Sequence, residues 1–320
     1  MSTAWACSSV GVCNRGSVAQ KGQWLVCAAL RHWSSASRED PDSGLWWSSR
    51  TRAAQASTAS GGCWTRRSWS CAVGCRVRAR SSRSTALTMF TTYDEQRQDR
   101  QLRGWVAEDG IPRVKIKIGE SWGRCEARDL WRVARARESI GDTAELYVDA
   151  NGGYGAKQAV KVAAGLDGQG VTWFEEPVSS DRLEDLAFVR GRVMADVTAG
   201  EYGYALPYFR RMLAAGAVDC LQADVTRCGG ITVWLRVAAL ALSHGLEISG
   251  HCAPHAHAHA AASVPILRHL EWFHDHVRIE RLLFEGTLDP AAGGIAPGRD
   301  GAPGLGLSLD AERARPYRTG

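Results

Sequence analysis

Residues 145–151 read ELYVDAN, residues 171–176 read VTWFEE and residues 197–201 read VTAGE. Each is a short apolar run that ends in or next to an acidic residue, which is typical of a buried parallel strand with a polar group at its carboxyl end. Further strands are predicted at residues 113–119, 220–225, 246–251 and 269–273, and helices at residues 126–140 and 156–166. Strands that alternate with helices predict parallel pairing through helical crossovers.

The ends of the predicted strands recur at intervals of 20 to 32 residues. They are marked by Lys117, Asp149, Glu175, Glu201, Asp224, His251 and Glu271. Seven such units are too many for an open sheet and suit a barrel. We therefore predict an α/β fold, a (β/α)7β TIM-like barrel over residues 89–285, followed by a C-terminal segment over residues 286–320.

The first 88 residues differ in composition from the rest of the chain. They are rich in Ser, Arg, Ala, Gly, Trp and Cys, hold six of the ten cysteines, and show no helical or strand period. A disordered tail is normally poor in Trp and Cys, and a packed core shows apolar periodicity, so this stretch fits neither description. We predict a disordered segment or one read from a shifted frame of a GC-rich gene. A genuine domain with weak patterning is the alternative.

The net charge of +5 is unevenly distributed. Residues 1–90 hold 12 Lys and Arg against 3 Asp and Glu, whereas residues 91–320 hold 27 against 31. The patterned part is therefore mildly acidic, which predicts no nucleic-acid partner. No apolar run reaches the roughly 18 residues of a membrane-spanning helix, and no signal peptide is recognisable. We expect a cytoplasmic protein with reduced cysteines and no membrane partner.

Carboxylates end three successive predicted strands, at Asp149, Glu175 and Glu201. Barrel enzymes gather their working groups at the carboxyl ends of the strands, so these side chains are expected to converge. Three unneutralised carboxylates would repel one another, and a hard divalent cation removes that cost. Oxygen ligands favour Mg²⁺ over Zn²⁺. A single strand-end acid more often caps the next helix, but three in register argue for one Mg²⁺ site.

Candidate bases occur at two places among the predicted strands. Lys115 and Lys117 alternate with apolar residues, so both side chains point into the barrel, where we expect each to depress the pKa of the other. Asp224 and His251 end adjacent strands, where the carboxylate would fix the tautomer of the imidazole. The run HCAPHAHAH at residues 251–259 offers zinc as an alternative, which we do not favour because no nearby carboxylate completes a motif.

Together these motifs resemble the enolase superfamily, and within it the mandelate racemase/muconate lactonizing enzyme family in its mandelate-racemase-like subgroup. The resemblance covers about residues 90–310. The matching motifs are Lys115-x-Lys117, Asp149-Ala-Asn151, Glu175-Glu-Pro, Gly200-Glu201, Asp224 with Gly229-Gly230, and His251. Members carry an N-terminal α+β capping domain, whose pattern residues 1–88 do not show.

The resemblance implies a role for each matching residue. The implied metal ligands are Asp149, Glu175 and Glu201; the implied bases are Lys117, with Lys115 beside it, and the Asp224–His251 dyad; the implied substrate contacts are Asn151 and Glu271. It also implies Mg²⁺-dependent abstraction of the proton α to a carboxylate, through a metal-stabilised enediolate.

Several functions remain open within that chemistry. We favour dehydration of an acid sugar or another small hydroxy-carboxylate, with racemisation or epimerisation of the same substrates as the alternative. An alternative of a different class is a catalytically inactive barrel remnant from a damaged reading frame. A homo-oligomeric assembly is compatible with the sequence.

Overall fold

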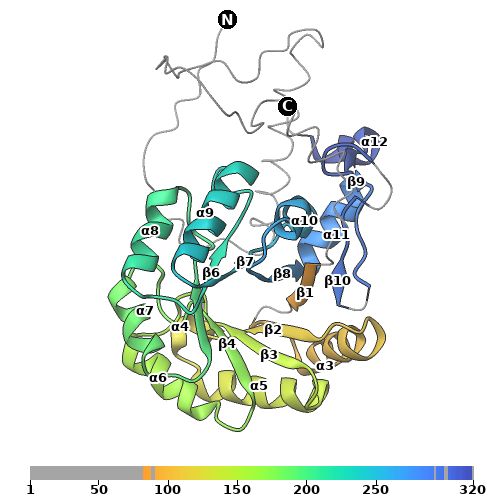
Figure 1. The fold of residues 1–320 in the computed structure, drawn as a ribbon. Coiled ribbons are helices and arrows are strands. Elements are labelled where there is room, and N and C mark those ends of the chain that lie inside the picture. The colour runs from red at the N-terminus through yellow and green to blue at the C-terminus, as the bar shows by residue number, and fades with distance from the viewer. Residues whose placement is uncertain (1–81, 88–90, 292, 299–301, 319–320) are drawn as a thin grey trace, which may run out of the picture. The chain divides into compact units, whose positions relative to one another are not determined.

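Eight parallel strands close into a ring in the computed structural model, which describes residues 82–87, 91–291, 293–298 and 302–318 (Figure 1). In ring order they are β1 (Ser82–Leu87), β2 (Arg113–Lys117), β3 (Glu145–Asp149), β4 (Val171–Glu175), β5 (Asp196–Ala199), β6 (Cys220–Ala223), β7 (Glu247–Gly250) and β8 (Leu267–Phe273). Strand β1 pairs in parallel with both β2 and β8, which closes the ring. The predicted (β/α)7β TIM-like barrel is confirmed.

Helices connect the successive strands and lie outside the ring (Figure 1). They are α3 (Glu95–Arg103), α5 (Glu126–Ile140), α6 (Ala156–Gly165), α7 (Leu183–Arg190), α8 (Leu206–Ala214), α9 (Ile231–Ser243) and α10 (Pro254–Ala262), with α11 (His274–Leu283) after β8. Short helices are the π-helical η1 (Gly104–Glu108), α4 (Glu120–Gly123), α12 (Ala311–Ala314) and η2 (Arg315–Tyr317). Acidic residues in the first turn of α5 and Arg137 in its last turn complement the helix dipole.

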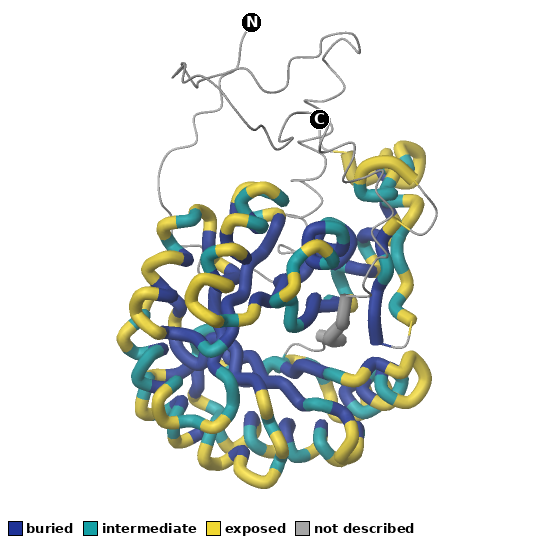
Figure 2. Tube along the Cα trace, in the orientation of Figure 1, coloured by how far each residue is buried: buried dark blue, intermediate teal, exposed yellow. Residues whose placement is uncertain are grey.

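Alternation along each strand separates two buried environments. On β2, Val114 and Ile116 are fully buried in the main apolar core, whereas Lys115 between them belongs to the polar interior of the ring. The interior also holds a separate buried cluster that contains Tyr147 and Trp173. Figure 2 shows that the described strands β2 to β8 are mostly buried, whereas the helices are exposed on their outward faces. Both faces of a barrel strand are thus covered, which explains the nearly continuous apolar runs in the sequence.

Strand β1 lies within the stretch 1–88 that the sequence predicts to be unpatterned. The letters SRSTAL carry little strand propensity, but β1 has a pairing partner on both sides, and such pairing overrides weak local preference. The short β10 (Gly294–Ile295) also pairs with it, antiparallel. The other residues of 1–88, namely 1–81 and 88, lie outside the described residues.

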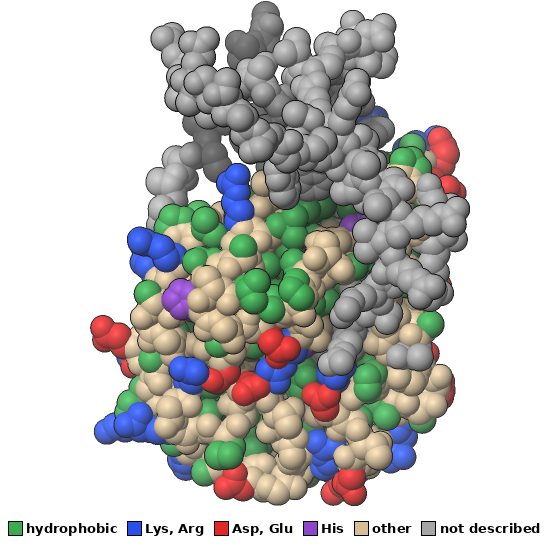
Figure 3. Space-filling view, in the orientation of Figure 1, with side chains coloured by type: hydrophobic (Ala, Val, Ile, Leu, Met, Phe, Trp, Pro, Cys, Tyr) green, Lys and Arg blue, Asp and Glu red, His purple; other side chains and the backbone are tan. Residues whose placement is uncertain are grey.

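The barrel belongs to one compact unit of the chain, Thr65–Arg313. Its last elements, β9 (Phe284–Glu285) and β11 (Ser308–Leu309), form a two-stranded antiparallel sheet. Within the described ranges, no helix is long and apolar enough to cross a bilayer. On the face shown in Figure 3, acidic and basic side chains are intermixed over the surface of the described residues.

Candidate active site

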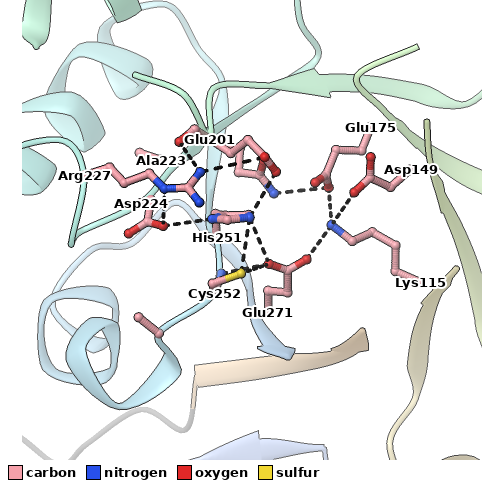
Figure 4. Close-up of polar contacts among 12 residues, drawn as sticks. Lys115, Asp149, Glu175, Glu201, Ala223, Asp224, Arg227, His251, Cys252 and Glu271 are labelled. Atoms are coloured by element: carbon pink, nitrogen blue, oxygen red, sulfur yellow. Dashed lines mark hydrogen bonds and ion pairs between the residues drawn. The ribbon is translucent and has the colours of Figure 1, made fainter. Parts of the chain in front are cut away.

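Three carboxylates meet at the carboxyl ends of the middle strands (Figure 4). Asp149 ends β3, Glu175 ends β4, and Glu201 follows β5, and each offers an oxygen within 4.8 Å of the others. Gly200 allows Glu201 to turn inward: its φ is +137°, and a Cβ there would lie 1.9 Å from the carbonyl oxygen of Gln222. The convergence expected from the sequence is confirmed.

The cluster has the chemistry of a site for a hard divalent cation. All three carboxylates are buried, and Glu175 Oε1 has no hydrogen-bond partner within the described part of the chain. Burial, together with the charges of Asp149 and Glu271, raises the pKa of Glu175 to about 8. The ammonium of Lys115 opposes this shift without cancelling it. A cation on the oxygen atoms would satisfy the unpartnered oxygen and relieve the repulsion, so the residues fit the metal that the sequence predicts.

Both lysines of β2 point into the same site. Lys115 Nζ donates to Glu175, lies 2.5 Å from Glu271 Oε1 and is 3.8 Å from Asp149 Oδ2. Lys117 Nζ donates to Asp149. The two ammonium groups therefore balance much of the negative charge of the cluster.

The expectation that the pKa values of these lysines are depressed is wrong, although Lys115 does act to lower the pKa of Lys117. Burial alone lowers the pKa of both amines, but the carboxylates around them outweigh burial and raise both pKa values above the usual range. The acting carboxylates are chiefly Glu175 and Glu271 for Lys115, and Asp149 for Lys117. The expectation took account of the neighbouring lysine but not of the acids that the fold brings into contact with each amine.

His251 occupies the other flank of the carboxylate cluster. Its Nδ1 lies 2.9 Å from Asp224 Oδ2, as expected for strand ends on adjacent strands, and its Nε2 lies 3.0 Å from Glu201 Oε2. Burial would lower the pKa of this imidazole, but the groups around it, Cys252 and Glu201 among them, raise it well above its usual value. Burial would raise the pKa of the Asp224 carboxyl, but the hydrogen bond from His251 outweighs it and lowers that pKa to about 2.

The remaining predicted residues, Glu271 and Asn151, also lie at the mouth. Glu271 Oε2 accepts a hydrogen bond of 2.8 Å from the backbone N–H of Cys252. The backbone of Asn151 has a left-handed φ of 43°, and its N–H donates to Asp149 Oδ1 at 2.8 Å. Its side-chain Nδ2 is buried and has no hydrogen-bond partner among the described residues. Asn151 therefore presents an amide donor next to the carboxylate cluster.

Sequence reasoning assigned no role to three further residues of the site. Glu176 is 1% exposed, and burial and the charge of Glu201 raise its pKa well above its usual value. Arg227 donates to the backbone oxygen of Glu201 at 3.1 Å, and its Nε lies 3.5 Å from Asp224 Oδ2. Gln222 Nε2 donates to Glu175 at 3.1 Å. The second acid of the Glu-Glu-Pro motif and the inward position of Gln222, two residues before Asp224, are signals that could have identified two of them.

The histidines after His251 do not form a zinc site. His255 Nδ1 lies 2.6 Å from Glu280 Oε2, so the fold supplies a carboxylate that the local sequence lacks, but this pair adds no third ligand in the described part of the chain. His257 Nε2 accepts from the backbone N–H of Val225 at 2.9 Å. Both imidazoles thus stabilise the loops beside the site.

Comparison with known proteins identifies the family. The family model described as enolase C-terminal domain-like matches residues 98–314. The chain belongs to this family. The resemblance seen in the sequence is thereby confirmed.

Two relatives with named activities are similar to this chain. L-talarate/galactarate dehydratase of Salmonella typhimurium is 30% identical over 184 residues, which cover 57% of this chain and 46% of that protein. D-galactarolactone cycloisomerase of Agrobacterium fabrum is 33% identical over 223 residues, covering 66% and 57%. The chain thus spans roughly half the length of the curated relatives it matches.

Solved structures of similar proteins share the barrel. A mandelate racemase/muconate lactonizing enzyme-like protein from Rubrobacter xylanophilus is 47% identical, with a TM-score of 0.70, covering 75% of this chain and 65% of that one. L-talarate dehydratase from Polaromonas, solved with Mg and L-glucarate, is 26% identical with a TM-score of 0.66, covering 73% and 63%.

Proposed function

We propose that this protein is an Mg²⁺-dependent dehydratase of acid sugars, acting by abstraction of the proton α to the substrate carboxylate. The observation that carries the proposal is a candidate base on each flank of the carboxylate cluster. Lys117 contacts Asp149 from β2, and His251, which follows β7, contacts Glu201. Strands β3, β4 and β5, which position the three carboxylates, lie between those flanks in the ring.

The proposed metal ligands are Asp149, Glu175 and Glu201. When bound, Mg²⁺ would neutralise the carboxylates that raise the pKa of Lys117 and would stabilise the negative charge that develops on the substrate carboxylate. Two similar proteins support this choice, because the dehydratase from Salmonella typhimurium was solved with Mg and L-lyxarohydroxamate and that from Polaromonas with Mg and L-glucarate. Asn151 and Glu271 are proposed to orient the substrate carboxylate beside the cluster.

The proposed chemical steps use the two flanks in sequence. Lys117 Nζ accepts the α-proton, while the protonated His251 donates a proton to the β-hydroxyl, which leaves as water. The C–O bond electrons leave with that oxygen, and the electrons of the broken C–H bond form the C=C bond of an enol. The enol then tautomerises to a 2-keto-3-deoxy acid. Asp224 supports this step because its carboxylate holds His251 in orientation at 2.9 Å.

The same pair of bases favours a second candidate function, epimerisation at the α-carbon. In that reaction Lys117 would accept the α-proton, His251 would donate its own proton to the opposite face of the α-carbon, and the β-hydroxyl would stay. The two functions differ in one product, since only dehydration yields a keto acid.

A screen of acid sugars tests the proposal. The full chain is incubated with aldonates and aldarates in MgCl₂, and keto-acid formation is followed with semicarbazide, with EDTA as the control. A version whose N-terminal segment is restored from another reading frame is assayed beside it. We expect keto-acid formation that stops with EDTA, with Lys117→Ala and with His251→Asn.

Three results would each contradict a part of this proposal. Full turnover in Lys117→Ala or in His251→Asn would show that the substituted residue is not a required base. Exchange of the α-proton in D₂O without keto acid would make the protein an epimerase. If neither version forms either product while Mg²⁺ is still bound, the inactive barrel is supported.

A further inference from the structure

A second group of potential ligands lies beside the carboxylate cluster, on His251, Cys252 and Glu271 (Figure 4). Cys252 Sγ lies 3.2 Å from His251 Nε2 and 3.2 Å from Glu271 Oε2, and these last two atoms are 3.7 Å apart. All three residues are buried. None of the proposed catalytic steps uses the thiol.

The spacing of these three atoms matches a tetrahedral metal site. With Zn–S of about 2.3 Å and Zn–N or Zn–O of about 2.0–2.1 Å, tetrahedral angles place ligand atoms about 3.3–3.6 Å apart. The observed separations of 3.2, 3.2 and 3.7 Å differ from that range by a few tenths of an ångström at most. Small side-chain rotations would therefore complete the geometry.

Neighbouring groups already orient the three ligands. Asp224 holds His251 Nδ1, which leaves Nε2 between the thiol at 3.2 Å and Glu201 Oε2 at 3.0 Å, and a carboxylate on the far nitrogen is the arrangement that supports a metal-bound histidine. The backbone N–H of Cys252 fixes Glu271 Oε2, and Lys115 holds the other oxygen of that carboxylate. Binding would replace the contact of His251 Nε2 with Glu201 and leave the other contacts of the three ligands in place.

We propose that His251, Cys252 and Glu271 form a second metal site for a thiophilic divalent cation such as Zn²⁺. Binding forms one metal–sulfur, one metal–nitrogen and one metal–oxygen bond, and the protons on the thiol and on the imidazole pass to solvent. A sulfur ligand disfavours Mg²⁺, whereas the all-oxygen set of Asp149 and its neighbours favours it. The two sites thus select different cations.

One consequence rests on the proposed function. A cation on His251 Nε2 removes the general acid that dehydration requires. We expect Zn²⁺ to inhibit turnover in the presence of saturating Mg²⁺, and to inhibit the Cys252→Ala variant at least tenfold less.

The site itself is tested without substrate. Co²⁺, which adopts Zn²⁺ geometry and gives a thiolate charge-transfer band, is titrated into the reduced, Mg²⁺-saturated full chain. We expect a charge-transfer band that saturates at one equivalent of Co²⁺ and disappears when Zn²⁺ is added. The band should be lost in Cys252→Ala and in His251→Asn, and it should remain in the matched control Cys228→Ala. The control removes another buried thiol from the same barrel. Equal band intensity in wild type and Cys252→Ala would overturn the proposal.

A measurement on the unmodified chain covers the case in which the variants do not fold. Crystals are soaked in Zn²⁺ and an anomalous difference map is calculated at the zinc edge. A peak between Cys252 Sγ and His251 Nε2 supports the site, and peaks only elsewhere overturn it. Since neither measurement involves turnover, their failure bears on this site alone, whereas lack of keto-acid formation bears on the proposed function alone.

Discussion

Two layers of the barrel interior, two residues apart along the same strands, have opposite chemistry. The lower layer is aromatic and the upper layer is acidic, and the pairs are Tyr147 and Asp149 on β3, Trp173 and Glu175 on β4, and His269 and Glu271 on β8. In the lower layer the rings of Tyr147 and Trp173 stack at 5.3 Å, and those of Trp173 and His269 meet at 4.8 Å.

The three rings of the lower layer are neutral, whereas the upper layer is charged. Burial raises the pKa of Tyr147 and lowers that of His269, so neither ring carries charge near neutral pH. A buried, uncharged aromatic floor lowers the local dielectric response, which strengthens each electrostatic interaction directly above it. We therefore expect the aromatic layer to matter for stability and the acidic layer to matter for metal binding and chemistry.

The largest effect is expected from the acidic layer, with Glu175→Gln. The amide keeps the shape of the side chain but removes one negative ligand, so Mg²⁺ binding and transition-state stabilisation are lost. We expect Mg²⁺-dependent turnover to fall about a thousandfold to ten-thousandfold, or about 4–5.5 kcal/mol. Mg²⁺ should also no longer raise the thermal unfolding temperature. An unchanged Mg²⁺-induced shift would remove Glu175 from the ligand set.

The next largest effect is expected from the aromatic layer, with Trp173→Ala. The indole is fully buried, and its removal leaves a cavity that the rigid ring of strands cannot close. We expect the free energy of unfolding to fall by about 3–4 kcal/mol in urea melts with EDTA present. Trp122→Ala is the control, because Trp122 is 72% exposed, and its effect should stay within about 0.5 kcal/mol. Similar losses of unfolding free energy in both variants would contradict a specific contribution of the aromatic layer to stability.

Most of the barrel could be predicted because its strands carry their own signal. The predicted helix over residues 126–140 coincides with α5. Both ends of each predicted strand lie within two residues of the observed ends. The acidic layer was also predictable, since Asp149 and Glu175 end consecutive apolar runs. Strand β1 was not, because SRSTAL forms a strand through its two partners and not through its own residues.

The electrostatics of the site could not be predicted from local sequence. Lys115 was expected to respond to Lys117, its neighbour on the strand, but its ammonium contacts Glu271, which is more than 150 residues away in the chain. Cys252 likewise gave no signal, because its approach to Glu271 depends on the packing of β7 against β8. Spacing predicts which residues share the mouth, and only the fold shows which of them touch.

The two layers should also differ in the sign of their pH dependence. His269 has a pKa well below the usual 6.5, so below about pH 6.5 the unfolded chain binds a proton that the folded chain does not, and stability falls with acidification. Glu175 has the opposite sign: its pKa of about 8 means that its contribution falls as pH rises from 4.5 to 8.

Urea melts of wild type and His269→Leu between pH 7.5 and 5, with EDTA present, isolate the first contribution. In wild type, His269 should make the free energy of unfolding fall by up to about 1.4 kcal/mol per pH unit below pH 6.5, and we expect this contribution to be absent from the variant. Parallel curves for the two proteins would mean that His269 is not held neutral by the fold. Glu175→Gln in the same series should change the slope in the other direction.

The smallest effect is expected from Trp173→Phe, which removes the hydrogen bond between the two layers. Trp173 Nε1 donates a hydrogen bond of 3.0 Å to Glu175 Oε2, and this bond joins the aromatic floor directly to a proposed metal ligand. Phenylalanine keeps most of the buried ring but has no donor, and Gln222 and Lys115 still hold the same oxygen. We therefore expect the free energy of Mg²⁺ binding to weaken by only about 1 kcal/mol, which calorimetry would detect as a roughly fivefold higher dissociation constant. The free energy of unfolding should change less than in Trp173→Ala.

Tyr147→Phe is the matched control, because that hydroxyl donates to Glu145, away from the carboxylate cluster, and its removal should leave Mg²⁺ affinity unchanged. Equal Mg²⁺ affinity in wild type and Trp173→Phe would show that the floor supports the acidic layer by packing alone.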